Sequence, residues 1–148
     1  MLDFIFLLVS GNNDTDFEAQ PSLEDKLRDF FSVPVYTWEL PKKRAFLILG
    51  MLARWNPESG VLYQDQLIHL CGLDIGSDGP NNLRAVKIAI SRTLNIKFVA
   101  SGNAINRNYT FKDASQKQTM LSLVNEAPYS NVFHHLIAEI AQHRRRRW

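Results

Sequence analysis

The chain has 148 residues, of which 45% are hydrophobic and 22% are charged. These values are ordinary for a folded protein of about one domain, and they argue against a disordered, collagenous or coiled-coil chain. The single cysteine, Cys71, excludes an internal disulfide and favours a reducing, cytoplasmic setting.

The net charge of +2 hides an uneven distribution of charge along the chain. Residues 1–30 hold seven acidic and two basic side chains, whereas residues 81–112 hold six basic side chains and no acidic one. Residues 144–147 add four consecutive arginines. Because a surface of one sign attracts a polymer of the opposite sign, residues 81–112 favour a nucleic-acid partner.

The apolar run over residues 1–9 is typical of a buried strand. It is shorter than the roughly 20 apolar residues that span a bilayer. It also carries Asp3 and lacks the basic start and cleavage site of a signal peptide. We therefore expect no membrane partner.

A helix and a second strand are predicted next. Ser22, three residues before Asp25, resembles a capping box that opens a helix to about Phe31. The β-branched and aromatic residues 33–40 then predict a strand. Pro34 confines it to a sheet edge, because proline cannot donate to a ladder.

Three helices are then predicted. Pro41 suits the first turn of a helix that runs to Trp55. A shorter helix over 63–71 is expected to end at Gly72 and to face inward through Tyr63, Leu67, Leu70 and Cys71. After a glycine-rich loop, a helix over 81–94 places its basic residues apart from an apolar side made of Leu83, Val86, Ile90 and Leu94.

The hydrophobic period changes after Asn95. Residues 96–100 and 107–111 predict the two strands of a hairpin with a polar tip. Two further helical patterns, about 115–125 and 131–143, complete the chain. The second has an apolar face for packing within the monomer or against a second copy, formed by Phe133, Leu136, Ile137 and Ile140.

Residues 38–111 resemble the OmpR/PhoB-type winged-helix domain, the effector half of many bacterial response regulators. The resemblance is carried by Trp38-Glu-Leu-Pro41, by residues 45–53 and 60–67, and above all by the basic and aliphatic helix from Asn82 to Leu94. The chain departs from the family in its longer turn over residues 101–109 and in having Tyr63 where a small capping residue is expected. Its first 30 residues are too few for a phosphoacceptor domain.

The resemblance implies a winged helix-turn-helix domain over residues 33–112. With the N-terminal strand–helix appendage (1–32) and the C-terminal helices and basic tail (113–148), the chain is expected to have an α+β fold. The helix over 81–94 would then enter the major groove of double-stranded DNA, and the wing over 96–111 would lie on the adjacent minor groove or backbone. The expected DNA-binding residues are Asn82, Arg84, Lys87, Ser91, Arg92, Lys97 and Arg107.

Each of these assignments has an alternative. The helix over 81–94 could be an ordinary solvated amphipathic helix, and Arg107 either an inserted minor-groove arginine or an exposed loop charge. Residues 144–147 could be a nonspecific electrostatic arm. As a whole, the chain could be a sequence-specific regulator, often a homodimer because half-sites pair. The rival function is a winged-helix protein-interaction module, an adaptor or small inhibitor that docks through its acidic first 30 residues.

The sequence offers no set of residues typical of catalysis. Its histidines, at 69, 134, 135 and 143, lack partners at metal-ligand spacing, and Cys71 lies on an apolar helix face. Phosphate-binding, nucleophile-elbow and dinucleotide motifs are missing. We therefore expect no enzyme activity, no metal and no cofactor.

Overall fold

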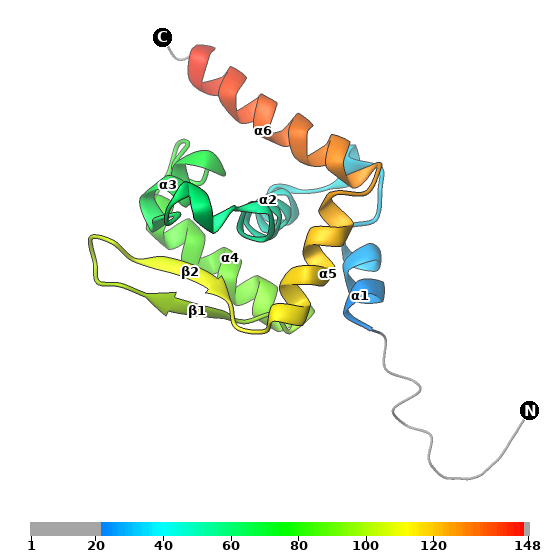
Figure 1. Ribbon diagram of the computed structural model, residues 1–148. Coiled ribbons are helices and arrows are strands. Elements are labelled where there is room, and N and C mark those ends of the chain that lie inside the picture. The colour runs from blue at the N-terminus through cyan, green and yellow to red at the C-terminus, as the bar shows by residue number, and fades with distance from the viewer. Residues whose placement is uncertain (1–21, 147–148) are drawn as a thin grey trace, which may run out of the picture.

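The computed structural model describes residues 22–146, which form an α+β fold of helices and one two-stranded antiparallel sheet (Figure 1). The strand predicted over residues 1–9 lies outside the described residues. In chain order the helices and strands are α1 (Leu23–Phe30), α2 (Leu40–Arg54), α3 (Gln64–Leu70), α4 (Gly79–Leu94), β1 (Phe98–Ser101), β2 (Asn108–Phe111), α5 (Ala114–Val124) and α6 (Tyr129–Arg146). No helix in this part of the chain is long and apolar enough to cross a membrane.

Helix α1 forms where the sequence predicts it. The Ser22 hydroxyl accepts a hydrogen bond from the Asp25 backbone N–H at 3.2 Å, which confirms the predicted cap. Leu27 is buried on its inner face. Arg28 reaches Glu126 through two hydrogen bonds and so ties α1 to the turn between α5 and α6.

The strand predicted over residues 33–40 is wrong. This segment holds a short 3-10 helix, η2 (Val35–Thr37), and the Trp38 indole N–H donates to the Ser32 carbonyl at 2.7 Å. The Trp38 ring packs against the rings of Phe31 and Phe46, with centroids 5.5 and 5.2 Å apart. Strand propensity reflects the fit of a side chain to its neighbours, and here those neighbours are helices.

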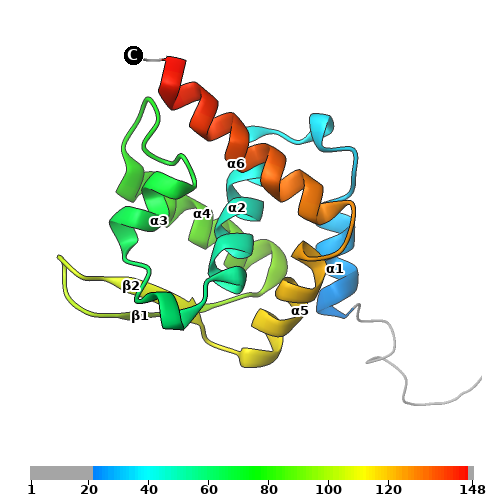
Figure 2. The same cartoon turned by 45° about the horizontal axis from the view of Figure 1, so that its top comes forward.

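Helix α2 is the centre of the fold. Figures 1 and 2 show it between α6 on one side and α4 with the hairpin on the other. Residues 45–50, Leu52 and Ala53 are all buried, as expected for a helix covered on most sides. A Cβ on Gly50 would lie 2.7 Å from the Phe133 ring, so glycine allows α6 to approach α2.

Helix α3 confirms the predicted short helix but corrects two of its inward-facing residues. Leu67 and Cys71 are buried, whereas Tyr63 and Leu70 are 41% and 38% exposed. Tyr63 precedes the helix in extended conformation, and its backbone N–H donates to the Gln66 side chain at 2.9 Å. Gly72, with a φ of 72°, turns the chain after α3.

Helix α4 confirms the predicted third helix and begins two residues earlier, at Gly79. Asp78 caps it by accepting a hydrogen bond from the Asn81 backbone N–H at 3.3 Å. The predicted apolar side is buried throughout, at Leu83, Val86, Ile90 and Leu94. At its C-terminal end Asn95 adopts the left-handed conformation.

The predicted hairpin forms from β1 and β2, with Phe98 paired to Phe111 and Ser101 to Asn108. A single antiparallel bridge joins Asn108 to Tyr63. The Gln64 N–H also donates to the Arg107 carbonyl at 2.7 Å. These bonds attach the start of α3 to the hairpin.

Helices α5 and α6 form at the predicted places and cover α2. Phe133 and Leu136 of α6 are buried, and Ile137 and Ile140 are half-buried against the core. The apolar face of the last helix therefore packs within the monomer.

Candidate nucleic-acid interface

The outer face of α4 carries basic, polar and small or apolar side chains. Its exposed residues are Pro80, Asn81, Arg84, Ala85, Ile88, Ala89, Arg92 and Thr93. The helix itself contains no acidic residue, and the nearest acid in the chain is its own cap, Asp78. This pattern follows from the helical period, because most of the residues between the buried apolar positions point away from the core.

A groove of about 340 Å³ separates α4 from β1 and contains most of the predicted DNA-binding residues. Arg84, Lys87, Ser91 and Lys97 line it, and no acidic residue does. The remaining lining residues are Ile88, Ile96, Phe98, Ala100 and Tyr109. The fold thus brings together, between helix and hairpin, cations that are up to 13 positions apart in the sequence.

Two contacts hold the lysines of this groove in place. The Lys87 ammonium lies 3.7 Å from the centroid of the Tyr109 ring, which is cation–π distance. The Lys97 ammonium donates to the Ser91 hydroxyl at 2.9 Å. Lys87 of α4 is therefore held against β2, and Lys97, just before β1, is held against α4.

A relay of hydrogen bonds orients Arg84 at the first turns of α4. The Asn81 amide donates to the Asp78 carboxylate at 2.7 Å, and the Asn81 amide oxygen accepts from the Arg84 guanidinium at 2.5 Å. Arg84 remains exposed. Its other guanidinium N–H groups are thus available to a ligand in a set orientation.

Asn82 is not a groove residue. Its side-chain amide donates to the Leu73 carbonyl and to the Ser77 hydroxyl, each at 2.7 Å, and it is half-buried. These bonds fasten the loop before α4 to the helix. The structure gives Asn82 a positioning role, unlike the contact role that the sequence predicts for it.

Arg92 and Arg107 do not line the groove but are exposed, Arg92 near the end of α4 and Arg107 just before β2. In the described part of the chain, every salt bridge involves Arg28, His69, His135 or Arg144. No basic residue between 81 and 112 is therefore neutralised by an acid.

Tyr109 lines the groove, although the sequence does not single it out as a site residue. The Tyr109 hydroxyl donates to the Gln64 side chain at 2.6 Å, so its ring forms a fixed wall of the groove. Side chains alternate along β2, so that Tyr109 and Phe111 are buried and Thr110 is exposed. This alternation is the sequence signal that could have placed Tyr109 on the inner side of the hairpin.

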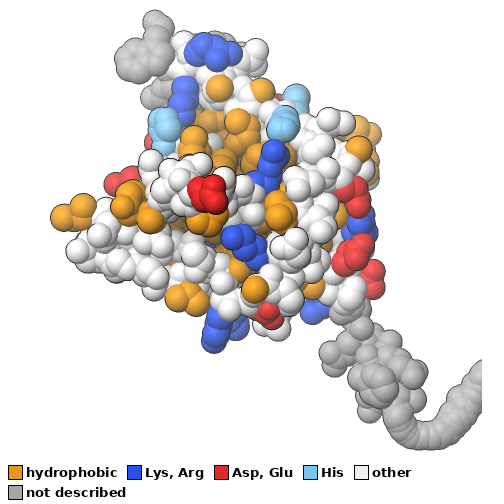
Figure 3. All heavy atoms as spheres, viewed as in Figure 1, with side chains coloured by type: hydrophobic (Ala, Val, Ile, Leu, Met, Phe, Trp, Pro, Cys, Tyr) orange, Lys and Arg blue, Asp and Glu red, His pale blue; other side chains and the backbone are white. Residues whose placement is uncertain are grey.

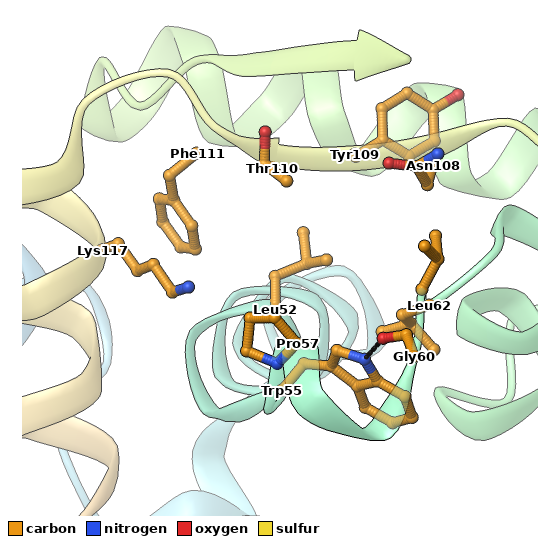
Figure 4. A pocket seen from close by; sticks show the side chains of 11 residues that line it. Leu52, Trp55, Pro57, Gly60, Leu62, Asn108, Tyr109, Thr110, Phe111 and Lys117 are labelled. Atoms are coloured by element: carbon orange, nitrogen blue, oxygen red, sulfur yellow. Dashed lines mark hydrogen bonds between the residues drawn. The ribbon is translucent and has the colours of Figure 1, made fainter. Parts of the chain in front are cut away.

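A second hollow, of about 180 Å³, lies between β2, α2 and α5 (Figure 4). Leu52, Trp55 and Phe111 give it an apolar lining, and Lys117 lies at its edge. The Trp55 indole N–H donates to the Gly60 carbonyl at 2.9 Å and fixes one wall.

The described residues contain no group of three or more metal-binding side chains. Burial raises the pKa of the Cys71 thiol, which disfavours the thiolate that a nucleophile needs. His69, His134, His135 and His143 are exposed and lie on or beside α3 and α6.

Arg144 does not belong to a free basic arm. Its guanidinium donates to the His69 carbonyl at 2.6 Å and to the Asp74 carboxylate at 2.7 Å. Desolvation is the largest single effect on the pKa of Asp74 and raises it, but the hydrogen bond and charge of Arg144, together with a backbone hydrogen bond, hold the pKa below its ordinary value. This arginine fastens α6 to the end of α3 and the loop that follows.

The comparison with known proteins adds no relative to this picture. No protein family, curated protein or solved structure matches the chain.

Proposed function

We propose that the chain is a winged helix-turn-helix protein of the cytoplasm that binds double-stranded DNA and regulates transcription from specific sites. The element order supports this assignment: α2, α3 and α4 form a three-helix unit, and β1 and β2 follow α4 directly as the wing. The bridge from Tyr63 to Asn108 adds the segment before α3 to the hairpin, as a short third strand does in this architecture.

The single observation that carries the proposal is the acid-free basic groove between α4 and the hairpin. The phosphate backbone dominates DNA affinity, and protein cations that replace its counterions supply that affinity. An acid in the same groove would repel the backbone. The groove has none, although the chain as a whole carries 15 acidic against 17 basic residues.

The geometry suggests which residues would contact bases in the major groove and which would contact phosphates. Arg84 and Arg92 are exposed arginines on α4, suited to the paired acceptors of guanine. Ala85 and Ala89, on the same face, leave room for close approach of the helix and can contact thymine methyl groups. Lys87, Ser91 and Lys97 lie toward the hairpin, where phosphates would pass.

Salt dependence tests this proposal. Binding of the full chain to a random-sequence duplex should weaken with salt, with a slope of log affinity against log salt of about −5 if six cations meet phosphates. Selection from a pool of random duplexes should then enrich a common sequence. The stoichiometry on the enriched duplex shows whether one copy or a homodimer binds. Absence of binding at low salt contradicts the proposal.

One observation favours the second candidate function, a winged-helix module that binds a protein. Ile88 in the groove is 45% exposed, and Tyr63, Leu70 and Val99 are exposed hydrophobic residues on neighbouring elements. Scattered apolar residues of this kind also occur on DNA-binding surfaces. This second function would be supported if the chain does not bind DNA and instead binds a protein partner.

A further inference from the structure

The hairpin ends in an exposed isoleucine. Ile105 is 89% exposed, the highest fraction of any large hydrophobic side chain in the described residues. Figure 3 shows hydrophobic atoms at the outermost end of the projecting hairpin. A branched apolar side chain is thus presented to solvent on the element that projects furthest beside the basic groove.

The turn that carries Ile105 is held by its own hydrogen bonds. The Asn103 side-chain oxygen accepts from the backbone N–H groups of Ile105 and Asn106, at 2.9 and 3.2 Å. The Asn106 side-chain oxygen accepts from the Asn103 N–H at 2.7 Å. Asparagine side chains that satisfy the backbone in this way define a fixed turn.

Gly102 closes the turn at its base. Its φ of 80° is one that glycine adopts readily, and a Cβ there would lie 2.5 Å from the Asn106 carbonyl oxygen. The Asn108 side chain donates to the same carbonyl at 3.2 Å. Ile105 is therefore displayed on a preformed support, which lowers the conformational cost of inserting it into a partner.

The charge around the tip identifies the partner that would accept this side chain. Arg107 is exposed two residues away, and no acid occurs between residues 81 and 112. An apolar side chain flanked by cations matches the proteins that insert a hydrophobic wedge between base pairs from the minor groove while basic groups bind the backbone. A site that binds another protein would more often present a broader apolar patch than a single side chain.

We propose that Ile105 is a wedge that enters the minor groove of the bound duplex, partly unstacks one base step and bends the DNA, with Arg107 on the groove edge. This inference rests on the proposed DNA binding. Flexible pyrimidine–purine steps such as TpA are the cheapest to unstack, so they are the preferred sites of insertion.

The test measures binding and bending separately on one probe. The probe is a 30-base-pair A+T-rich duplex with central TpA steps, labelled at its ends with a donor and an acceptor dye. Binding is followed by anisotropy and bending by energy transfer. The variants are Ile105→Ala, Ile105→Phe and Ile105→Lys, with Leu40→Ala as the control, because Leu40 is an exposed aliphatic residue of α2 that does not line the groove.

The wild-type chain is expected to raise energy transfer on binding. Ile105→Ala should bind about tenfold more weakly, the loss expected when the outer carbons of the isoleucine no longer reach a dry environment. It should also leave the duplex straight. Ile105→Phe should retain the bend, and Ile105→Lys should bind at low salt without bending, because a cation attracts DNA but does not unstack it.

Two results would overturn the wedge and leave DNA binding intact: a wild-type complex with no bend, or an Ile105→Ala complex bent as much as the wild type. A wild-type chain that fails to bind the duplex at low salt would instead overturn the proposed function, and the wedge with it. Because Ile105 is almost fully exposed, unfolding in urea should be the same for all these tip variants.

Discussion

The ammonium of Lys87 in α4 lies 3.7 Å from the centre of the Tyr109 ring in β2, and the Tyr109 hydroxyl donates to Gln64 in α3 at 2.6 Å. One tyrosine thereby joins the helix, the hairpin and the preceding short helix. This contact and the hydrogen bond from Lys97 to Ser91 join the two walls of the groove through side chains.

Replacing Tyr109 with phenylalanine should lower the free energy of unfolding by about 1 kcal/mol, because Gln64 loses its donor while the ring and its contact with Lys87 remain. Urea unfolding measures the change. Thr110→Val, on the exposed side of the same strand, is the control and should have a smaller effect. Equal losses in the two variants would show that the Tyr109 hydrogen bond contributes nothing specific.

Asp78 caps α4 and places a negative charge next to its first turn, and two substitutions separate these two effects. Asp78→Ala should cost about 0.5–2 kcal/mol of stability, because the Asn81 N–H loses its acceptor. Asp78→Asn retains a capping side chain and removes the negative charge. It should bind DNA about 2- to 5-fold more tightly at low salt. Unchanged or weaker binding by Asp78→Asn would argue against DNA contact near this end of α4.

Gly50 sets the distance between α2 and α6. Gly50→Ala places a Cβ 2.7 Å from the Phe133 ring, and overpacking of this kind should cost about 1–3 kcal/mol in urea unfolding. Adding Phe133→Leu should recover part of that loss, since the smaller side chain leaves room for the new methyl group. If the double variant is as unstable as the sum of the two single variants, the close approach is not the cause.

The ion pair between Arg28 and Glu126 should make stability depend on pH in the acid range. The hydrogen bond from Arg28 holds the pKa of Glu126 below its ordinary value of 4.5. A carboxyl whose pKa is lowered in the folded state contributes stability above its unfolded pKa and loses it as the pH falls through the folded value. The contribution is therefore complete at pH 7 and declines below about pH 4.5.

Urea unfolding of the wild type and Glu126→Gln over the range from pH 7 to pH 3 measures this contribution. The wild type should be more stable at pH 7, and the difference should shrink as the pH falls below 4.5. Glu58→Gln, an exposed acid with no salt bridge in the described structure, is the control. A difference that stays constant with pH would contradict the assignment.

The helices and the hairpin were predictable because their signals are local. The 3.6-residue period of Leu83, Val86 and Ile90 indicates α4 without knowledge of any other element. The period of two at Tyr109 and Phe111 similarly indicates β2. The sequence also predicted that the basic residues of α4 and of the hairpin lie close together, because consecutive elements of a chain often pack side by side.

What the sequence did not predict depends on contacts between distant residues. Trp38 has the propensity of a strand residue, but its ring packs between Phe31 and Phe46 and its segment turns instead. Asn82 resembles its exposed neighbours until the loop brings the Leu73 carbonyl within reach of its amide. Arg144 likewise belongs to a basic run in the sequence and to an ion pair with Asp74 in the fold.

The central claim, that the α4 face binds DNA, is tested most directly by removing single charges from α4 and, as a control, from α2. Arg84→Gln and Arg92→Gln remove exposed arginines of α4, whereas Arg54→Gln removes an exposed arginine of α2 that lies over Phe133 of α6. Affinity for the duplex enriched from the random pool is measured by anisotropy across a range of salt concentrations. We predict losses of about 1–3 kcal/mol for Arg84→Gln and Arg92→Gln and a change near zero for Arg54→Gln. Equal affinities for all three variants and the wild type would contradict the account.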